Sequence, residues 1–179
     1  HKHERIEDFK VFSLADPKIS NTFNPLIGGT PQEVSDRILQ AFEFDDPYYK
    51  GVQGSIVLNT LRLFSSLKIV PTFKTLFEAI KNPVVLMKMA TDSGESDLIK
   101  WASEEKAIQP LEREKRISGI VSKLQPFANG DLAHLFNAEK PDIDIKRIVL
   151  KGDIVYFQIP ALTLPEFGTY TGRFILQCF

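Results

Sequence analysis

Hydrophobic positions along the chain repeat mostly at helical intervals, with strand-like runs near the two ends. Residues 9–14 are rich in aromatic and β-branched side chains and are followed by Ala15-Asp16-Pro17, which predicts a short strand ending in a turn. Apolar residues then recur at three- and four-residue spacing as far as residue 127. The pattern predicts one strand, then five or six helices, then a return to strand.

Several helix beginnings carry N-terminal signals. Thr30, Pro31 and Glu33 fit the N-cap, first and third positions of a capping box. Asp46 and Thr72 are predicted to cap the next two helices, and Ser96 a later one. The predicted helices cover about residues 31–42, 47–68, 73–80, 84–90, 97–106 and 110–127.

The helix over residues 47–68 is apolar nearly all round, which predicts a central position. Glycine inside a helix costs about 1 kcal/mol relative to alanine, so Gly51 and Gly54 predict a close approach of a neighbouring helix. The residues expected on its main apolar stripe are Tyr49, Val52, Ile56, Leu63 and Leu67.

The last third of the chain contains two β-rich runs, residues 147–150 and 154–159, on either side of a turn-like Lys151-Gly152-Asp153. The second run is the stronger strand prediction. After it, a helix is expected to begin near Pro165, with an apolar face of Tyr170, Phe174 and Ile175.

Composition limits the classes of function. The chain has 179 residues, of which 43% are hydrophobic, enough to form one sizeable core. A net charge of −1 argues against tight binding of nucleic acid through charge alone. No apolar run has the length of a membrane span, so we expect a soluble segment. The chain lacks an initial methionine and finishes on an apolar stretch, which suggests a piece of a longer protein.

Motifs for catalysis are missing where they would be expected. Gly28-Gly29 precedes a helix, but a P-loop also needs a lysine and a hydroxyl directly after its last glycine, so we interpret the pair as a chain reversal. The apolar run over residues 154–157 lacks the acid that ends a Walker B strand. No catalytic residue is predicted. A metal site is not expected either, because the histidines are separated in the sequence and are interpreted as solvated: His1, His3 and His134.

Basic residues form the candidate binding surface. Arg116 and Lys123 are seven residues apart on one side of the predicted helix from residue 110, where such a pair could follow a phosphate backbone. Interleaved Glu112 and Glu114 leave open an ordinary solvated face. The candidate nucleic-acid-binding residues are Arg113, Lys115, Arg116, Lys123, Lys146 and Arg147.

Several stretches resemble conjugative coupling proteins of the TraD/TraG class, the HerA/FtsK-like ATPases of type IV secretion. The resemblance covers most of the chain and keeps the order of the family's segments. It rests on VFSLADPKISNTFNPL (residues 11–26), GTPQEVSDRI (29–38), PYY (47–49), PDIDI (141–145), GDIVYFQIPAL (152–162) and GRFIL (172–176).

This resemblance implies a fold that is mainly α. In the family, an all-helical domain is inserted in a RecA-like α/β motor between the Walker A segment and the Walker B strand. Residues 1–24 would then be a motor strand and loop, residues 25–140 the inserted helical domain, and residues 141–179 the returning motor strand or strands and a C-terminal helix. The family's catalytic lysine and acids have no matching positions here.

The resemblance also implies a function for the parent protein. That protein would be a hexameric, membrane-anchored, ATP- and magnesium-dependent DNA translocase at the cytoplasmic face of the bacterial inner membrane. The helical domain would lie in the cytoplasm, bind no cofactor itself, and meet single-stranded DNA or the relaxase of the relaxosome. Two alternatives stay open: a helical protein–protein adaptor without a DNA role, and part of a chromosomal HerA/FtsK-like DNA pump.

Overall fold

A computed structural model describes residues 9–44, 46–160 and 162–179. This part of the chain is mainly helical, as predicted, with a small two-stranded parallel sheet. Its elements are β1 (Phe9–Ser13), α1 (Pro31–Ala41), α2 (Pro47–Ser66), α3 (Phe73–Lys81), α4 (Pro83–Ser93), α5 (Ser96–Ala107), α6 (Pro110–Asn129), the 3₁₀ turn η1 (Ala133–Leu135), α7 (Ile145–Lys151), β2 (Ile154–Gln158) and α8 (Pro165–Leu176).

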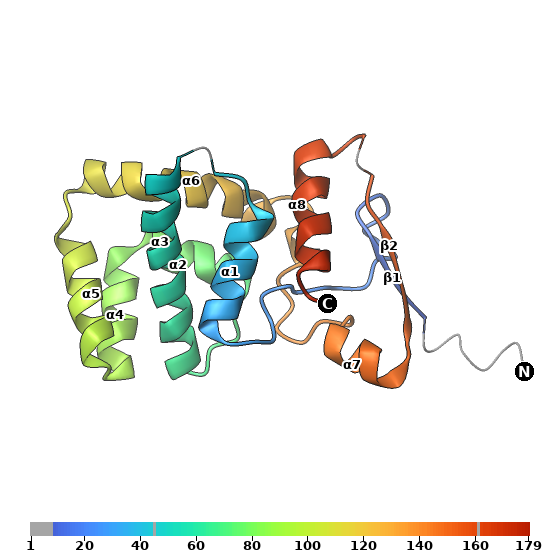
Figure 1. Ribbon diagram of the computed structural model, residues 1–179, viewed down its shortest axis with the longest axis horizontal. Coiled ribbons are helices and arrows are strands. Elements are labelled where there is room, and N and C mark those ends of the chain that lie inside the picture. The colour runs from blue at the N-terminus through green and yellow to red at the C-terminus, as the bar shows by residue number, and fades with distance from the viewer. Residues whose placement is uncertain (1–8, 45, 161) are drawn as a thin grey trace, which may run out of the picture.

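The helices α1 to α6 gather at one end of the molecule, and the strands lie with α7 at the other end (Figure 1). Helix α8 stands between the two groups and packs against α1. Helix α2 contacts α1, α3, α4 and α6, so its predicted central position is confirmed.

The helix starts follow the signals in the sequence. Thr30 and Glu33 form the predicted capping box, in which the Thr30 amide donates to Glu33 Oε2 at 2.6 Å. Asp46 caps α2, and Thr72 caps α3. The prediction for Ser96 was wrong: Ser96 is the first residue of α5, and no side chain caps that helix.

The Gly28-Gly29 pair reverses the chain before α1, as predicted. Both glycines have positive φ angles, 81° and 95°, which side chains disfavour. The Arg37 guanidinium donates to the carbonyls of Pro25 and Gly28 and holds the turn against α1.

The two strands pair with each other in parallel, with Phe9 opposite Ile154 and Ser13 opposite Gln158. The inner face of the sheet carries Phe12 and Phe157, whose ring centroids lie 5.9 Å apart. The outer face is apolar and open to solvent: the exposed fractions are 47% for Phe9, 46% for Ile154 and 54% for Tyr156.

Residues 147–150 correct a prediction, because they belong to helix α7 and not to a strand. Asp144 Oδ1 accepts the Arg147 amide at 3.2 Å and caps this helix. Ile145 and Ile148 are buried on one side, three residues apart, and Gly152 ends the helix at a φ of 71°. Capping and burial at helical spacing outweigh the β-propensity of the run.

One hydrophobic cluster joins the three predicted segments. The Phe127 ring lies 4.7 Å from that of Phe73 and 5.6 Å from that of Phe174 on α8, measured between centroids. Phe12 of β1 packs edge-on against Phe136 at 5.4 Å. The core therefore continues across the boundaries near residues 24 and 140, and the assignment of the flanking segments to a motor domain stays a prediction.

Candidate nucleic-acid interface

The six predicted basic residues fall into three groups, and the first, Arg113 and Arg116, faces a buried carboxylate. Arg113 is only 5% exposed and donates to the carbonyls of Ile80 at 2.6 Å and Lys81 at 3.3 Å, at the end of α3. Burial lowers the pKa of the Arg113 guanidinium, and the nearby Glu105 carboxylate counteracts this. Arg113 joins α6 to α3, and we remove it from the candidate binding surface.

Arg116 is tied to the same buried carboxylate. Its Nη2 lies 3.4 Å from Glu105 Oε1, and Arg113 Nε lies 3.8 Å from Glu105 Oε2. Glu105 is itself buried on α5. The two arginines and the glutamate therefore form a small ionic cluster between α5 and α6. The phosphate track expected from Arg116 and Lys123 stays a prediction.

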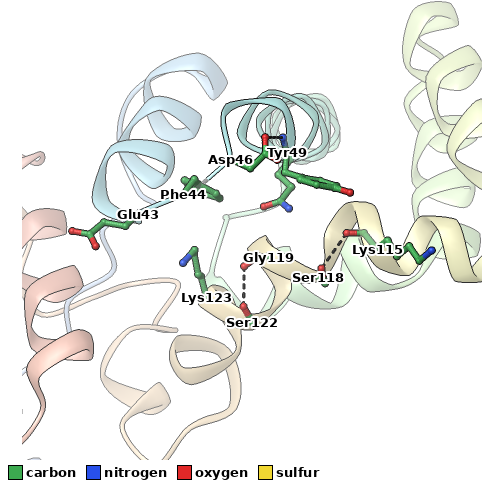
Figure 2. A pocket seen from close by; sticks show the side chains of 10 residues that line it. Glu43, Phe44, Asp46, Tyr49, Lys115, Ser118, Gly119, Ser122 and Lys123 are labelled. Atoms are coloured by element: carbon green, nitrogen blue, oxygen red, sulfur yellow. Dashed lines mark hydrogen bonds between the residues drawn. The ribbon is translucent and has the colours of Figure 1, made fainter.

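Lys115 and Lys123 form the second group and line one hollow of about 500 Å³ between α6, the N-terminal part of α2 and residues 43–44. Figure 2 shows Lys123 extending from α6 toward Phe44. Its Nζ lies 5.6 Å from the Phe44 ring centroid and 5.8 Å from that of Tyr170. Among the described residues, neither lysine has an acidic partner within 4.0 Å.

Two carboxylates also line the hollow, but both are engaged. Glu43 Oε1 lies 2.5 Å from Arg173 Nη2 of α8. Asp46 Oδ1 accepts the amides of Tyr48 at 2.8 Å and Tyr49 at 3.4 Å, as the cap of α2. Of the described residues that line the hollow, Lys115 and Lys123 are therefore the cationic ones without an acidic partner within 4.0 Å.

Gln53 forms the buried wall of the hollow. Its side chain comes from α2 and is only 2% exposed, and Oε1 has no hydrogen-bond partner among the described residues. It lies directly over Gly119 of α6: a Cβ atom at position 119 would stand 2.8 Å from Gln53 Nε2. The glycine thus provides the space in which the amide sits.

Aromatic and hydroxyl groups complete the lining. Tyr49, expected on the apolar stripe of α2, is instead 39% exposed at the hollow and packs edge-on against the more exposed Tyr48. The hydroxyls of Ser118 and Ser122 donate to carbonyls of their own helix at 3.0 Å, which leaves lone pairs free to accept (Figure 2).

Lys146 and Arg147 are the third group and lie on α7, beside the strands and away from α6 (Figure 1). Both are exposed. They line a different hollow, of about 610 Å³, together with Arg37 and Lys140. These two residues therefore lie near the returning strand β2, as expected from the sequence, and apart from the lysines of α6.

Sequence reasoning missed Gln53, Phe44 and the two serines. Gln53 did not stand out in the sequence, because the same helix also carries Lys50, Asn59 and Arg62. The serines of α6 carried no signal, because hydroxyl residues on an exposed helix face are ordinary.

Metal ligands do not cluster in the part of the chain described, where no three His, Cys, Asp or Glu side chains come together. His134 is exposed near the carbonyl of Asp131, and His1 and His3 lie outside the described residues. Of the described helices, none has the length and hydropathy to cross a membrane.

No family model matches the chain, and neither a curated protein nor a solved structure matches it. We call the hollow lined by Lys115, Lys123 and Gln53 the α6 hollow. The proposed function depends on the resemblance in the sequence and on the chemistry of this hollow.

Proposed function

We propose that this chain is the helical recognition domain of a DNA-translocating coupling ATPase of conjugative type IV secretion, and that the α6 hollow contacts single-stranded DNA. The observation that carries the proposal is the pair Lys115 and Lys123, which have no acidic partner among the described residues, in one hollow with the exposed ring of Tyr49.

Single-stranded nucleic acid is bound by groups of these two kinds. Lysines attract the phosphates, and aromatic rings stack on the bases regardless of sequence. A net charge of −1 limits the electrostatic contribution of the whole domain, so we expect micromolar, salt-sensitive binding. Translocation, with its ATP and magnesium, would belong to the motor of the parent protein.

The sheet supports an origin within a larger α/β domain. Parallel sheets occur almost only with both faces covered, and a two-stranded sheet has little stability of its own. Here the two strands pair in parallel, and their outer face leaves Phe9, Ile154 and Tyr156 exposed. A RecA-like motor would supply further strands beside this pair and helices over its open face.

The direct test is fluorescence anisotropy with a labelled single-stranded oligothymidine over a salt series. We expect Lys115→Glu/Lys123→Glu to bind about tenfold or more weakly than the unaltered chain, because two phosphate contacts become repulsive. Arg116 is left in place, since reversing its charge would disturb buried Glu105.

A matched control carries the same charge change elsewhere. Lys88 on α4 and Lys100 on α5 are exposed and lie outside the hollow, so Lys88→Glu/Lys100→Glu is expected to retain most of the affinity. Equal losses in the two double variants would show a general charge effect and contradict a site at α6. Absence of binding at low salt would reject the DNA contact. In the full-length parent, Lys115→Glu/Lys123→Glu is expected to reduce DNA transfer and leave ATP hydrolysis intact.

A second candidate function is a protein-binding adaptor, and one surface favours it. A second hollow of about 500 Å³ along α6, which shares Ser118 and Ser122 with the first, is lined by Ile108, Ile117 and Val121. Leu111 and Val84 are exposed and follow the lining residues Pro110 and Pro83 in the sequence. If a relaxase or another protein binds there, charge reversal at Lys115 and Lys123 will leave that binding and DNA transfer unchanged. A chromosomal DNA pump could use the same α6 surface, and the transfer assay separates that reading from conjugation.

A further inference from the structure

The buried amide of Gln53 extends the proposed DNA contact, on which this inference depends. We infer that the α6 hollow takes up one unstacked nucleobase, whose edge donates a hydrogen bond to Gln53 Oε1. The inference concerns how the strand is held, whereas the proposed function requires only that it is held.

The first reason is the state of the acceptor. Gln53 Oε1 is buried and has no hydrogen-bond partner among the described residues. A buried polar atom without a partner destabilises the fold, so such atoms are rare and call for an explanation. Gln53 lines the hollow, so a donor on a ligand there borders its amide and reaches Oε1 when the amide turns toward the hollow.

The second reason is the space left around the amide. Position 119 of α6 is glycine, and any larger residue would place Cβ within 3 Å of the Gln53 amide. The hollow in front of the amide measures about 500 Å³, within the range of small-molecule sites in proteins. A single nucleobase fits a volume of this size.

The third reason is the chemistry of the lining, which favours a nucleotide over an acidic peptide. A carboxylate side chain is only an acceptor, so an acidic peptide could reach Gln53 Oε1 only through a backbone N–H, whereas every nucleobase carries an N–H group on its edge. The exposed ring of Tyr49 provides a stacking surface beside the amide. Lys115 and Lys123 are eight residues apart, or about 12 Å along the helix, so one strand can meet both through its phosphates.

The test changes the ligand before it changes the protein. Thymine has one hydrogen-bond donor, N3–H, and methylation at N3 removes that donor while keeping the charge and the ring. We compare binding of oligothymidine and N3-methyl oligothymidine to the unaltered chain by anisotropy. The methylated strand is expected to bind about three- to tenfold more weakly, which corresponds to the loss of one hydrogen bond.

Protein variants then locate the effect. Gln53→Leu removes the acceptor with little change in volume and is expected to bind the two oligonucleotides equally. Its thermal midpoint should be no lower than that of the unaltered chain, since a buried unpartnered group is lost. Gln40→Leu makes the same change at an exposed position of α1, outside the hollow, and should retain the preference for the unmethylated strand.

Each outcome decides a different point. Equal, salt-sensitive binding of both strands by the unaltered chain would overturn the base contact and leave the proposed DNA surface standing. Binding of neither strand at low salt would overturn both. Displacement of oligothymidine by a poly-glutamate peptide of equal charge, at equal concentration, would identify a general anion surface and overturn the base contact.

Discussion

Arg113 and Glu105 illustrate how position decides what a charged residue does. Both look like ordinary members of a solvated helix face in the sequence, yet the carboxylate and guanidinium are buried together between α5 and α6. Such a pair is weak as a source of stability, but it is costly to break, because the partner left behind keeps an unpaired buried charge.

Glu105→Ala is therefore expected to lower the free energy of unfolding by about 3–5 kcal/mol, since Arg113 would keep its charge in a buried site. Urea denaturation followed by circular dichroism measures the change. The matched control is Glu104→Ala at the neighbouring exposed position, for which a change within about 0.5 kcal/mol is expected. Similar effects of the two substitutions would contradict the structural role given to the ionic cluster.

Single residues also mark the limit of sequence reasoning. The prediction of a close helix approach is confirmed at Gly54, where a Cβ atom would stand 2.9 Å from Leu39 Cδ1, but not at Gly51, which faces open space. Tyr49 was expected inside and lies at the rim of the hollow. Spacing along one helix indicates a face, but only the neighbouring helices determine which part of that face is covered.

At the scale of elements, local signals predicted most helix boundaries. The caps at Thr30, Asp46 and Thr72 depend on residues within one turn of the chain, so they can be predicted from the local sequence alone. The run 147–150 was mistaken for a strand because its β-branched residues are also compatible with a short capped helix. In that run, burial of Ile148 against the core decides the outcome, and burial is not a local property.

Helix α8 offers a pH-dependent test of how it docks. Burial, together with the hydrogen bond to Glu166, raises the pKa of Tyr170 to about 12. The folded chain then keeps the phenol proton that an unfolded chain releases near pH 10, so stability is present below pH 10 and falls as the pH rises toward 12.

The expected result is a decline in the free energy of unfolding between about pH 10 and 12 that is smaller in Tyr170→Phe, which has no phenol to titrate. Chemical denaturation at a series of pH values measures both slopes, and lysine titration is common to the two proteins. Identical slopes would mean that Tyr170 is not held in a buried site on α8.

At the scale of the whole molecule, the order of strand, helices and strand was predictable, and the parallel pairing of the end strands was left open by the sequence. Pairing of residues 9–13 with 154–158 depends on the path of everything between them. The α6 hollow was unpredictable for the same reason, since Gln53 and Gly119 meet only when α2 crosses α6. A site made of residues far apart in the sequence cannot be predicted from local patterns.

We propose that single-stranded DNA binds at the hollow between α2 and α6. The most direct measurement is an amide NMR titration of the isotopically labelled chain with oligothymidine. We expect salt-sensitive shifts concentrated at the Gly119 backbone amide and the Gln53 side-chain NH₂ group. Shifts confined to Lys146 and Arg147 on α7, or no shifts at low salt, would contradict it.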